Sequence, residues 1–153
     1  MKLLLPWNVS DKEKVLYCER IGRVVSQANT WEIPVMVEPV LLAVPRNADV
    51  IEQELEVARV AYDLGADIIK ITFPGARATE KLVSELDIPI LVAGGALAGD
   101  ADSTIRDAEE AIGAGAQGPL VGRKVRQRPA EDARLVLSRL ATISRERYTR
   151  QVL

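Results

Sequence analysis

The chain has 153 residues, a length typical of one domain, and its 48% apolar and 27% charged residues are usual for a soluble globular protein. A net charge of -2 argues against a general role in binding nucleic acid or a membrane surface. The sequence contains no histidine and a single cysteine, Cys18, so histidine bases, histidine metal sites and an intramolecular disulfide are excluded. Any catalysis must therefore rest on Lys, Asp, Glu, Tyr or backbone groups.

No apolar run approaches the ~18 residues that a membrane span needs. Residues 1–6 are too short for a signal peptide and are broken by a proline. The unpaired cysteine is typical of a reducing compartment. We therefore expect a cytoplasmic protein with no membrane and no nucleic-acid partner.

Apolar runs alternate with amphipathic segments along the chain. Strands are expected at residues 2–7, 33–38, 66–75, 88–93 and 115–123. Helices are expected from a cap within residues 8–11 to about residue 28, over 49–64, over 76–86, from a cap within 99–103 to about 113, and over 129–143. Residues 39–47 are expected to form a loop, and residues 144–153 a polar tail that frays.

Five successive strand and helix units favour right-handed βαβ connections around a parallel sheet. A weak internal repeat, in which the segments 33–35 and 88–90 resemble each other, favours a (β/α) barrel over a doubly wound sheet. Eight units over ~250 residues are usual for that barrel, so about five units predict a partial one. We expect an α/β fold of TIM-barrel type, with residues 1–153 forming a single partial-barrel domain.

One amine, that of Lys70, stands inside the otherwise apolar run 66–75. Strand alternation places it on the face opposite Ile69 and Ile71. Lys2 and Glu38 have the same parity on neighbouring strands, so the three side chains could converge in a parallel barrel.

A lysine acts as a nucleophile when its amine is neutral, which burial and a nearby cation favour. Lys2 would be that cation for Lys70, and Glu38 would move protons to and from a carbonyl adduct. Two alternatives remain open: Lys70 and Glu38 form a structural ion pair, or the lysine reaches past the strand end to solvent.

Glycines follow the last two expected strands. Gly94 and Gly95 come after the fourth, and Gly122 precedes Arg123 after the fifth. Glycines let backbone N–H groups approach a phosphate, and an arginine adds bidentate charge. Each signal alone is more often a turn, and the two together leave a phosphate site and a pair of turns as equal alternatives. The further basic residues Lys124, Arg126 and Arg128 are interpreted as a solvated helix entrance.

Three strings together resemble the class I, Schiff-base aldolase superfamily of deoxyribose-phosphate, archaeal fructose-bisphosphate and tagatose-bisphosphate aldolases. They are found at residues 65–71, at residues 88–95, and at residues 111–116 together with 121–123. The resemblance covers nearly the whole chain and implies that it corresponds to barrel strands four to eight.

The resemblance implies that Lys70 is the Schiff-base lysine and that Gly94, Gly95, Gly122 and Arg123 bind a substrate phosphate. Lys2 and Glu38 resemble site residues of the tagatose-bisphosphate branch. The archaeal fructose-bisphosphate branch has an acid-base tyrosine near the position of Glu38, so this chain favours Glu38 as the proton shuttle.

The leading hypothesis is a carbon–carbon lyase that acts on a phosphorylated sugar or dihydroxyacetone phosphate. It would need no metal or organic cofactor, because a protonated imine withdraws electrons itself. The competing hypothesis is a catalytically silent phosphate-binding or assembly module. A five-stranded partial barrel leaves sheet edges open, so we expect a homo-oligomer.

Overall fold

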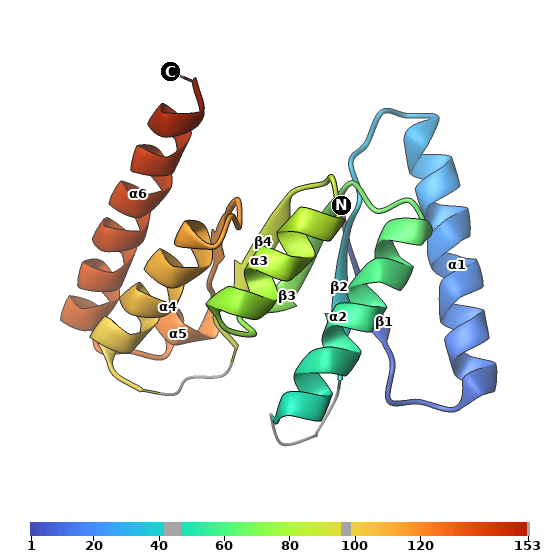
Figure 1. The fold of residues 1–153 in the computed structure, drawn as a ribbon, viewed down its shortest axis with the longest axis horizontal. Helices are drawn as coiled ribbons and strands as arrows, with labels where there is room; N and C mark the ends of the chain where they lie inside the picture. The colour runs from blue at the N-terminus through green and yellow to red at the C-terminus, as the bar shows by residue number, and fades with distance from the viewer. Residues whose placement is uncertain (42–46, 96–98, 153) are drawn as a thin grey trace. The chain divides into compact units, whose positions relative to one another are not determined.

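A computed structural model describes residues 1–41, 47–95 and 99–152 and shows an α/β fold with five parallel strands in chain order (Figure 1). The predicted fold class is confirmed. The strands are β1 (Lys2–Pro6), β2 (Met36–Val40), β3 (Ile68–Thr72), β4 (Ile90–Ala93) and β5 (Gly118–Leu120). The helices are α1 (Asp11–Asn29), α2 (Ala48–Asp63), α3 (Ala76–Glu85), α4 (Ala101–Gly113), α5 (Arg123–Arg126) and α6 (Ala130–Val152).

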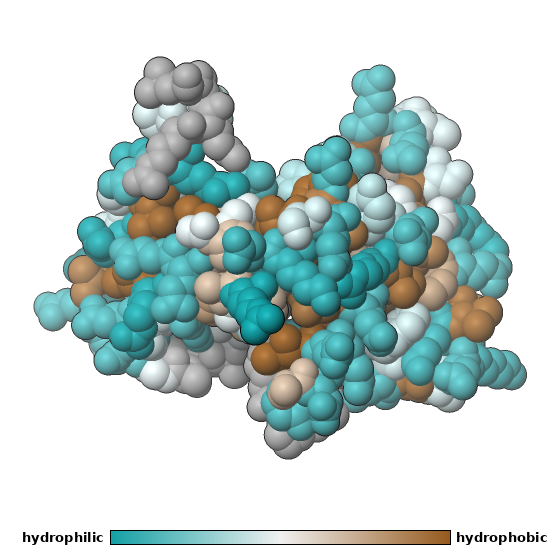
Figure 2. Space-filling model, in the orientation of Figure 1, coloured by the Kyte–Doolittle hydropathy of each residue, from teal (hydrophilic) through white to brown (hydrophobic). Residues whose placement is uncertain are grey.

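The chain divides into two compact units. Unit 1 consists of Met1–Ile71 with Leu86–Pro89, and unit 2 of Thr72–Glu85 with Ile90–Leu153. Figure 2 shows mainly hydrophilic side chains on the helix surfaces that face the viewer in both units, as expected for helices whose apolar sides pack inward.

In unit 1, α1 packs on β1 and α2 packs on β2 (Figure 1). The strands run parallel, with Leu4 opposite Glu38 and Val37 opposite Ile69. The strand side chains on the helix-covered face are almost fully buried, and they are Leu5, Val37, Ile69 and Ile71. Alternation then leaves Glu38 and Lys70 on the other face of the sheet.

Two side chains cap the helices of unit 1. Ser10 accepts a hydrogen bond from the Glu13 N–H, and the Glu13 carboxylate accepts one from the Ser10 N–H, which forms a capping box at α1. Asn47 caps α2 by accepting from the Val50 N–H. The expectation that Asp49 caps this helix was therefore wrong by two residues, because the amide oxygen of Asn47 accepts the hydrogen bond of the Val50 N–H and makes Asn47 the N-cap.

Strand β2 begins three residues later than predicted. The Val35 N–H donates to the Asp67 carboxylate at 2.7 Å, and the Asp67 N–H donates back to the Val35 carbonyl at 2.9 Å. This side-chain bond takes the place of a ladder bond, so regular pairing starts at Met36. The strand continues to Val40, into the predicted loop; residues 42–46 of that loop lie outside the described residues.

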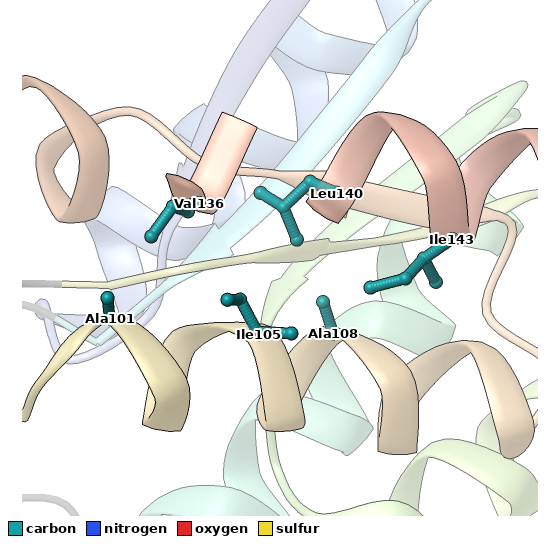
Figure 3. Packing of buried hydrophobic residues seen from close by; sticks show 6 residues of the cluster. All are labelled: Ala101, Ile105, Ala108, Val136, Leu140 and Ile143. Atoms are coloured by element: carbon teal, nitrogen blue, oxygen red, sulfur yellow. The ribbon is translucent and has the colours of Figure 1, made fainter. Parts of the chain in front are cut away.

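In unit 2, β4 pairs with β5, and α4 packs against α6 and β5. Figure 3 shows side chains from α4 and α6 pointing toward one another across a shared apolar core. The core residues are Ala101, Ile105, Ala108, Val136, Leu140 and Ile143. Burial of one such aliphatic side chain stabilises the unit by roughly 1.5–3 kcal/mol, so this contact fixes α6 on α4.

The carboxyl-terminal part differs from the prediction in two ways. Strand β5 ends at Leu120, and the short helix α5 begins at Arg123, whereas the strand was expected to continue to residue 123. Helix α6 then extends to Val152, where a fraying tail was expected from residue 144. One reason is that Arg147 donates hydrogen bonds to the carbonyls of Ile112 and Gly115, which anchors the later turns of α6 to the end of α4.

Candidate functional site

The face of the sheet opposite Val37 and Ile69 in unit 1 carries the three ionisable residues that the sequence singled out. Glu38 and Lys70 directly follow Val37 and Ile69, which are paired in register on β2 and β3. Lys2 lies on β1, two residues before the residue opposite Glu38. Parallel pairing therefore gathers side chains from three successive strands at one place.

Glu38 bridges the two lysines. Its Oε1 accepts a hydrogen bond from the Lys70 Nζ at 2.6 Å, and its Oε2 accepts one from the Lys2 Nζ at 2.6 Å. The side chains of Lys70 and Glu38 are 12% and 17% exposed, whereas that of Lys2 is 45% exposed. The Lys70 amine thus lies in a largely enclosed site, and the Lys2 amine lies at its open side.

The charge state of Glu38 follows from this arrangement. Burial alone raises the pKa of the Glu38 carboxyl, but the hydrogen bonds from Lys2 and Lys70 and the positive charges of both amines outweigh burial and hold the pKa below its ordinary value. Glu38 is therefore a carboxylate near neutral pH, and its two oxygens accept hydrogen bonds from the two amines.

The structure brings Lys2, Glu38 and Lys70 together as the sequence predicted, with one difference in connectivity. Lys2 was expected to act on Lys70 directly as a neighbouring cation. Instead its amine contacts Glu38, which lies between the two lysines. The chemical roles of the three residues remain predictions, because the Lys70–Glu38 contact also fits the alternative of a structural ion pair.

The glycine signals lie in unit 2. Gly94 follows β4, and a Cβ atom there would lie 2.9 Å from the Val121 Cγ1, so only glycine fits without a shift. Gly95 has a φ of +70°, which favours glycine. Gly122 is the N-cap of α5 and makes no side-chain capping bond, and Arg123 is the exposed first residue of α5. Gly94 and Gly95 are half-buried, whereas Gly122 and Arg123 offer the exposed backbone and guanidinium groups that an anion site uses.

One site feature was missed at the sequence level. Lys124 was interpreted as solvated, yet it is only 9% exposed, and its Nζ donates to the Asp107 Oδ2 at 2.8 Å. A weak signal was present in the sequence: Asp107 lies three residues after Thr104 and four before Ala111, at the border of the buried stripe of α4. A carboxylate at that border can pair with a lysine whose amine is buried.

Arg128 was also interpreted as solvated. Instead, its hydrogen bonds connect α5 to the start of α4. Its guanidinium donates to the carbonyls of Gly99 and Asp100, and its Nε donates to the carbonyl of Lys124. Of the three basic residues, Arg126 alone is exposed as predicted. Arg128 is therefore a structural clamp between α5 and the start of α4.

A small cavity in unit 2 adjoins these residues, and its wall includes Phe73, Gly94, Thr104, Asp107 and Lys124. Within residues 1–41, 47–95 and 99–152, no three Cys, Asp or Glu side chains are grouped so that they could hold a metal ion. Among the residues that the structure describes, none of the helices combines the length and apolar character that crossing a bilayer requires.

Comparison with known proteins finds matches over most of the chain. Residues 1–128 match the model of a family described as DeoC/LacD family aldolase. The chain is 32% identical over 120 residues to 2-amino-3,7-dideoxy-D-threo-hept-6-ulosonate synthase 1 of Archaeoglobus fulgidus, which covers 77% of this chain and 44% of that protein. It is 29% identical over 117 residues to the class 1 fructose-bisphosphate aldolase of Thermoproteus tenax, covering 72% and 43% of the two chains.

Among solved structures, the chain is similar to a Schiff-base-forming fructose-1,6-bisphosphate aldolase studied through its reaction intermediates. The TM-score is 0.80 and the identity 27%, over 94% of this chain and 57% of that chain. The chain thus spans about half the length of the relatives that it matches.

Proposed function

Because the chain belongs to the DeoC/LacD family of aldolases, we propose that it catalyses carbon–carbon bond cleavage or formation in a phosphorylated ketose through a Schiff base on Lys70. The observation that carries this proposal is the Glu38 carboxylate held 2.6 Å from the amine of a largely buried lysine. A nucleophile within hydrogen-bond reach of a proton acceptor is the arrangement that amine catalysis requires.

The first half of the proposed reaction forms the imine. Glu38 takes a proton from the Lys70 ammonium, and the neutral amine adds to the ketone carbon of the substrate. Loss of the carbonyl oxygen as water leaves a protonated imine between the Lys70 nitrogen and that carbon. Lys2 keeps the Glu38 carboxylate in place during these transfers through its own 2.6 Å hydrogen bond.

In the cleavage direction, Glu38, which has given its first proton to the departing water, takes the proton of the hydroxyl next to the breaking bond. The carbon–carbon bond electrons move toward the imine. This releases an aldehyde and leaves an enamine on Lys70. Glu38 then returns a proton to the enamine carbon, and hydrolysis of the imine frees the ketone and the lysine. Every step uses groups of the chain, the substrate or water.

The substrate class follows from the second group of residues. We propose that the backbone N–H groups near Gly94, Gly95 and Gly122, together with the Arg123 guanidinium, hold the substrate phosphate. The exposure of Gly122 and Arg123 supports this assignment, because a planar guanidinium beside an open glycine can bind a phosphate with two parallel hydrogen bonds. Dihydroxyacetone phosphate is the smallest substrate that fits the scheme.

The sheet edges support a proposal about assembly. Among the described residues, the pairing of β1 is with β2 and that of β5 is with β4, which leaves one side of each strand without a strand partner. Open strand edges favour association. We propose a homo-oligomer, and a molar mass of one chain by light scattering at micromolar concentration would contradict it.

Hydrogen exchange tests the proposed function without knowledge of the aldehyde. Imine formation makes the hydroxymethyl hydrogens of dihydroxyacetone phosphate acidic, so the protein should exchange one of them with deuterium in D₂O, as followed by proton NMR. We expect Lys70→Met to abolish exchange and Glu38→Gln to slow it by about 10²-fold or more. The exposed Lys81 of α3 provides the matched control, Lys81→Met, which should exchange at the normal rate.

Unchanged exchange in Lys70→Met would reject Lys70 as the nucleophile. Phosphate binding with no exchange in the unmodified protein would instead favour the competing function, a phosphate-binding module in which Lys70 and Glu38 form a structural ion pair.

A further inference from the structure

Helix α5 is too short to fix its own position. It has four residues, and its first backbone bonds run from the N–H groups of Val125 and Arg126 to the Gly122 carbonyl. Isolated helices of this length are unstable in water, so the place of Gly122 and Arg123 depends on contacts that α5 makes with the rest of unit 2.

Besides the Arg128 clamp between α5 and the start of α4, two contacts involve residues of α5 itself. Val125 packs against the apolar core shared by α4 and α6. On another side, Lys124 turns inward and its Nζ pairs with Asp107, in the middle of α4. The neighbouring residues Arg123 and Arg126 are exposed, so Lys124 differs from the basic residues beside it.

The aliphatic stem of Lys124 also contacts the loop after β4. A Cβ atom on Gly94 would lie 3.3 Å from the Lys124 Cδ and 3.4 Å from its Cγ, so the stem lies directly over the Gly94 backbone. The Lys124 side chain therefore lies against Gly94, which follows β4, and its amine is paired with Asp107 of α4. Lys124 itself directly follows Arg123 in the chain.

Burial of this lysine is costly unless its charge is paired. The Asp107 Oδ2, 2.8 Å away, supplies the pairing, and the side chains of Lys124 and Asp107 are 11% and 40% exposed. Because the amine is directed to Asp107, Lys124 acts on the anion site through backbone placement and not as a direct ligand.

We propose that Lys124, paired with Asp107, is a positioning residue that holds the Gly94 backbone and the adjacent Arg123 in the arrangement that binds the substrate phosphate. This inference rests on the proposed function, which names the phosphorylated substrate. It attributes to the Lys124–Asp107 pair an effect on the affinity for the phosphate group and not for the rest of the substrate.

The test compares a ketone that carries a phosphate with one that does not. Borohydride trapping is measured over a range of concentrations of dihydroxyacetone phosphate and, separately, of dihydroxyacetone. Lys124→Met keeps the apolar stem over Gly94 and removes the amine, and Asp107→Asn removes the charge from the other side. In both variants we expect the half-saturating concentration of dihydroxyacetone phosphate to rise about tenfold or more, with less than about a twofold change for dihydroxyacetone.

The matched control is Glu109→Gln, also on α4. Glu109 pairs with Arg139 at 3.0 Å, and both side chains are about half exposed. This variant should change neither half-saturating concentration. Lys124→Arg, which keeps the charge, should restore the affinity for dihydroxyacetone phosphate to within about threefold of the unmodified protein.

An equal rise for both ketones would show a general disturbance of the fold, and no rise for either would show that the pair does not matter; both results overturn the inference. If the unmodified protein traps neither ketone, the proposed function fails, and the inference is decided by titration with inorganic phosphate, followed through the amide NMR signals of Gly94 and Arg123. Those signals should shift in the unmodified protein, with about tenfold weaker binding in Lys124→Met. Signals that do not shift, or equal affinities, would overturn the inference.

Discussion

Replacement of Glu38 by glutamine tests whether the carboxylate holds two ammonium groups together. Both lysine amines lie 2.6 Å from oxygens of the same carboxylate, so they are no more than about 7 Å apart. Glutamine keeps the shape of the side chain and removes its charge. Lys2 and Lys70 then repel each other with no anion between them.

The repulsion of two unit charges about 7 Å apart is about 2 kcal/mol at an effective dielectric constant of 20 and about 0.5 kcal/mol in bulk water. Lys2 is 45% exposed, which moves the value toward the lower figure, whereas Lys70 is only 12% exposed. With the loss of the charge-assisted hydrogen bonds, we expect Glu38→Gln to lower the free energy of unfolding at pH 7 by about 1–2 kcal/mol.

The pH dependence has a definite sign. The pKa of Glu38 is lower in the folded protein than its ordinary value of 4.5. Its contribution to stability is therefore complete above that ordinary value and is lost as the pH falls through the lowered pKa of the folded state. Once protonated, Glu38 resembles glutamine, so the difference between the two proteins should vanish at low pH.

Urea unfolding of both proteins at pH values from 7 down to 3 measures this difference. Glu19→Gln is the control, because the ion pair of Glu19 with Arg23 has side chains 59% and 67% exposed and should contribute less than about 0.5 kcal/mol. A loss of stability in Glu38→Gln that persists unchanged at pH 3, or no loss at pH 7, would refute the bridging role.

Gly94→Ala places a Cβ atom 2.9 Å from the Val121 Cγ1, so thermal unfolding should show a destabilisation of about 1–3 kcal/mol. The control Gly113→Ala has no atom within 4 Å of its added Cβ and should be neutral or stabilising. Equal effects of the two substitutions would contradict the packing argument. Ser10→Ala removes the acceptor for the Glu13 N–H and should lower the free energy of unfolding by about 1 kcal/mol in urea, and an unchanged midpoint would show that the capping box contributes little.

The sequence was sufficient to predict the faces of the strands. Alternation placed Lys2, Glu38 and Lys70 together because each strand of unit 1 is short and regular and has its other face covered by helices. The connectivity could not be predicted, because the side-chain pairing depends on strand register. Register here is fixed in part by the Asp67 carboxylate, which bonds the Val35 N–H and delays the start of β2.

The misinterpretation of Lys124 has a different cause. Charged residues that follow a strand are usually solvated, and no local pattern distinguishes Lys124 from Arg126. Its burial depends on Asp107, 17 residues earlier in the chain, and on the lack of a side chain at Gly94. This contact joins Lys124 of α5, Asp107 of α4 and Gly94 after β4, so it depends on the folded arrangement of unit 2. In the sequence, the position of Asp107 beside the buried stripe of α4 is the one signal that indicates it.

The central claim is that Lys70 forms a covalent imine. The most direct measurement is borohydride reduction of the protein with dihydroxyacetone phosphate, followed by peptide mapping with mass spectrometry. The account predicts one stable adduct per chain, on the peptide that contains Lys70, and its loss in Lys70→Met. An adduct on another lysine, or none at saturating ligand under conditions in which phosphate is bound, would contradict it.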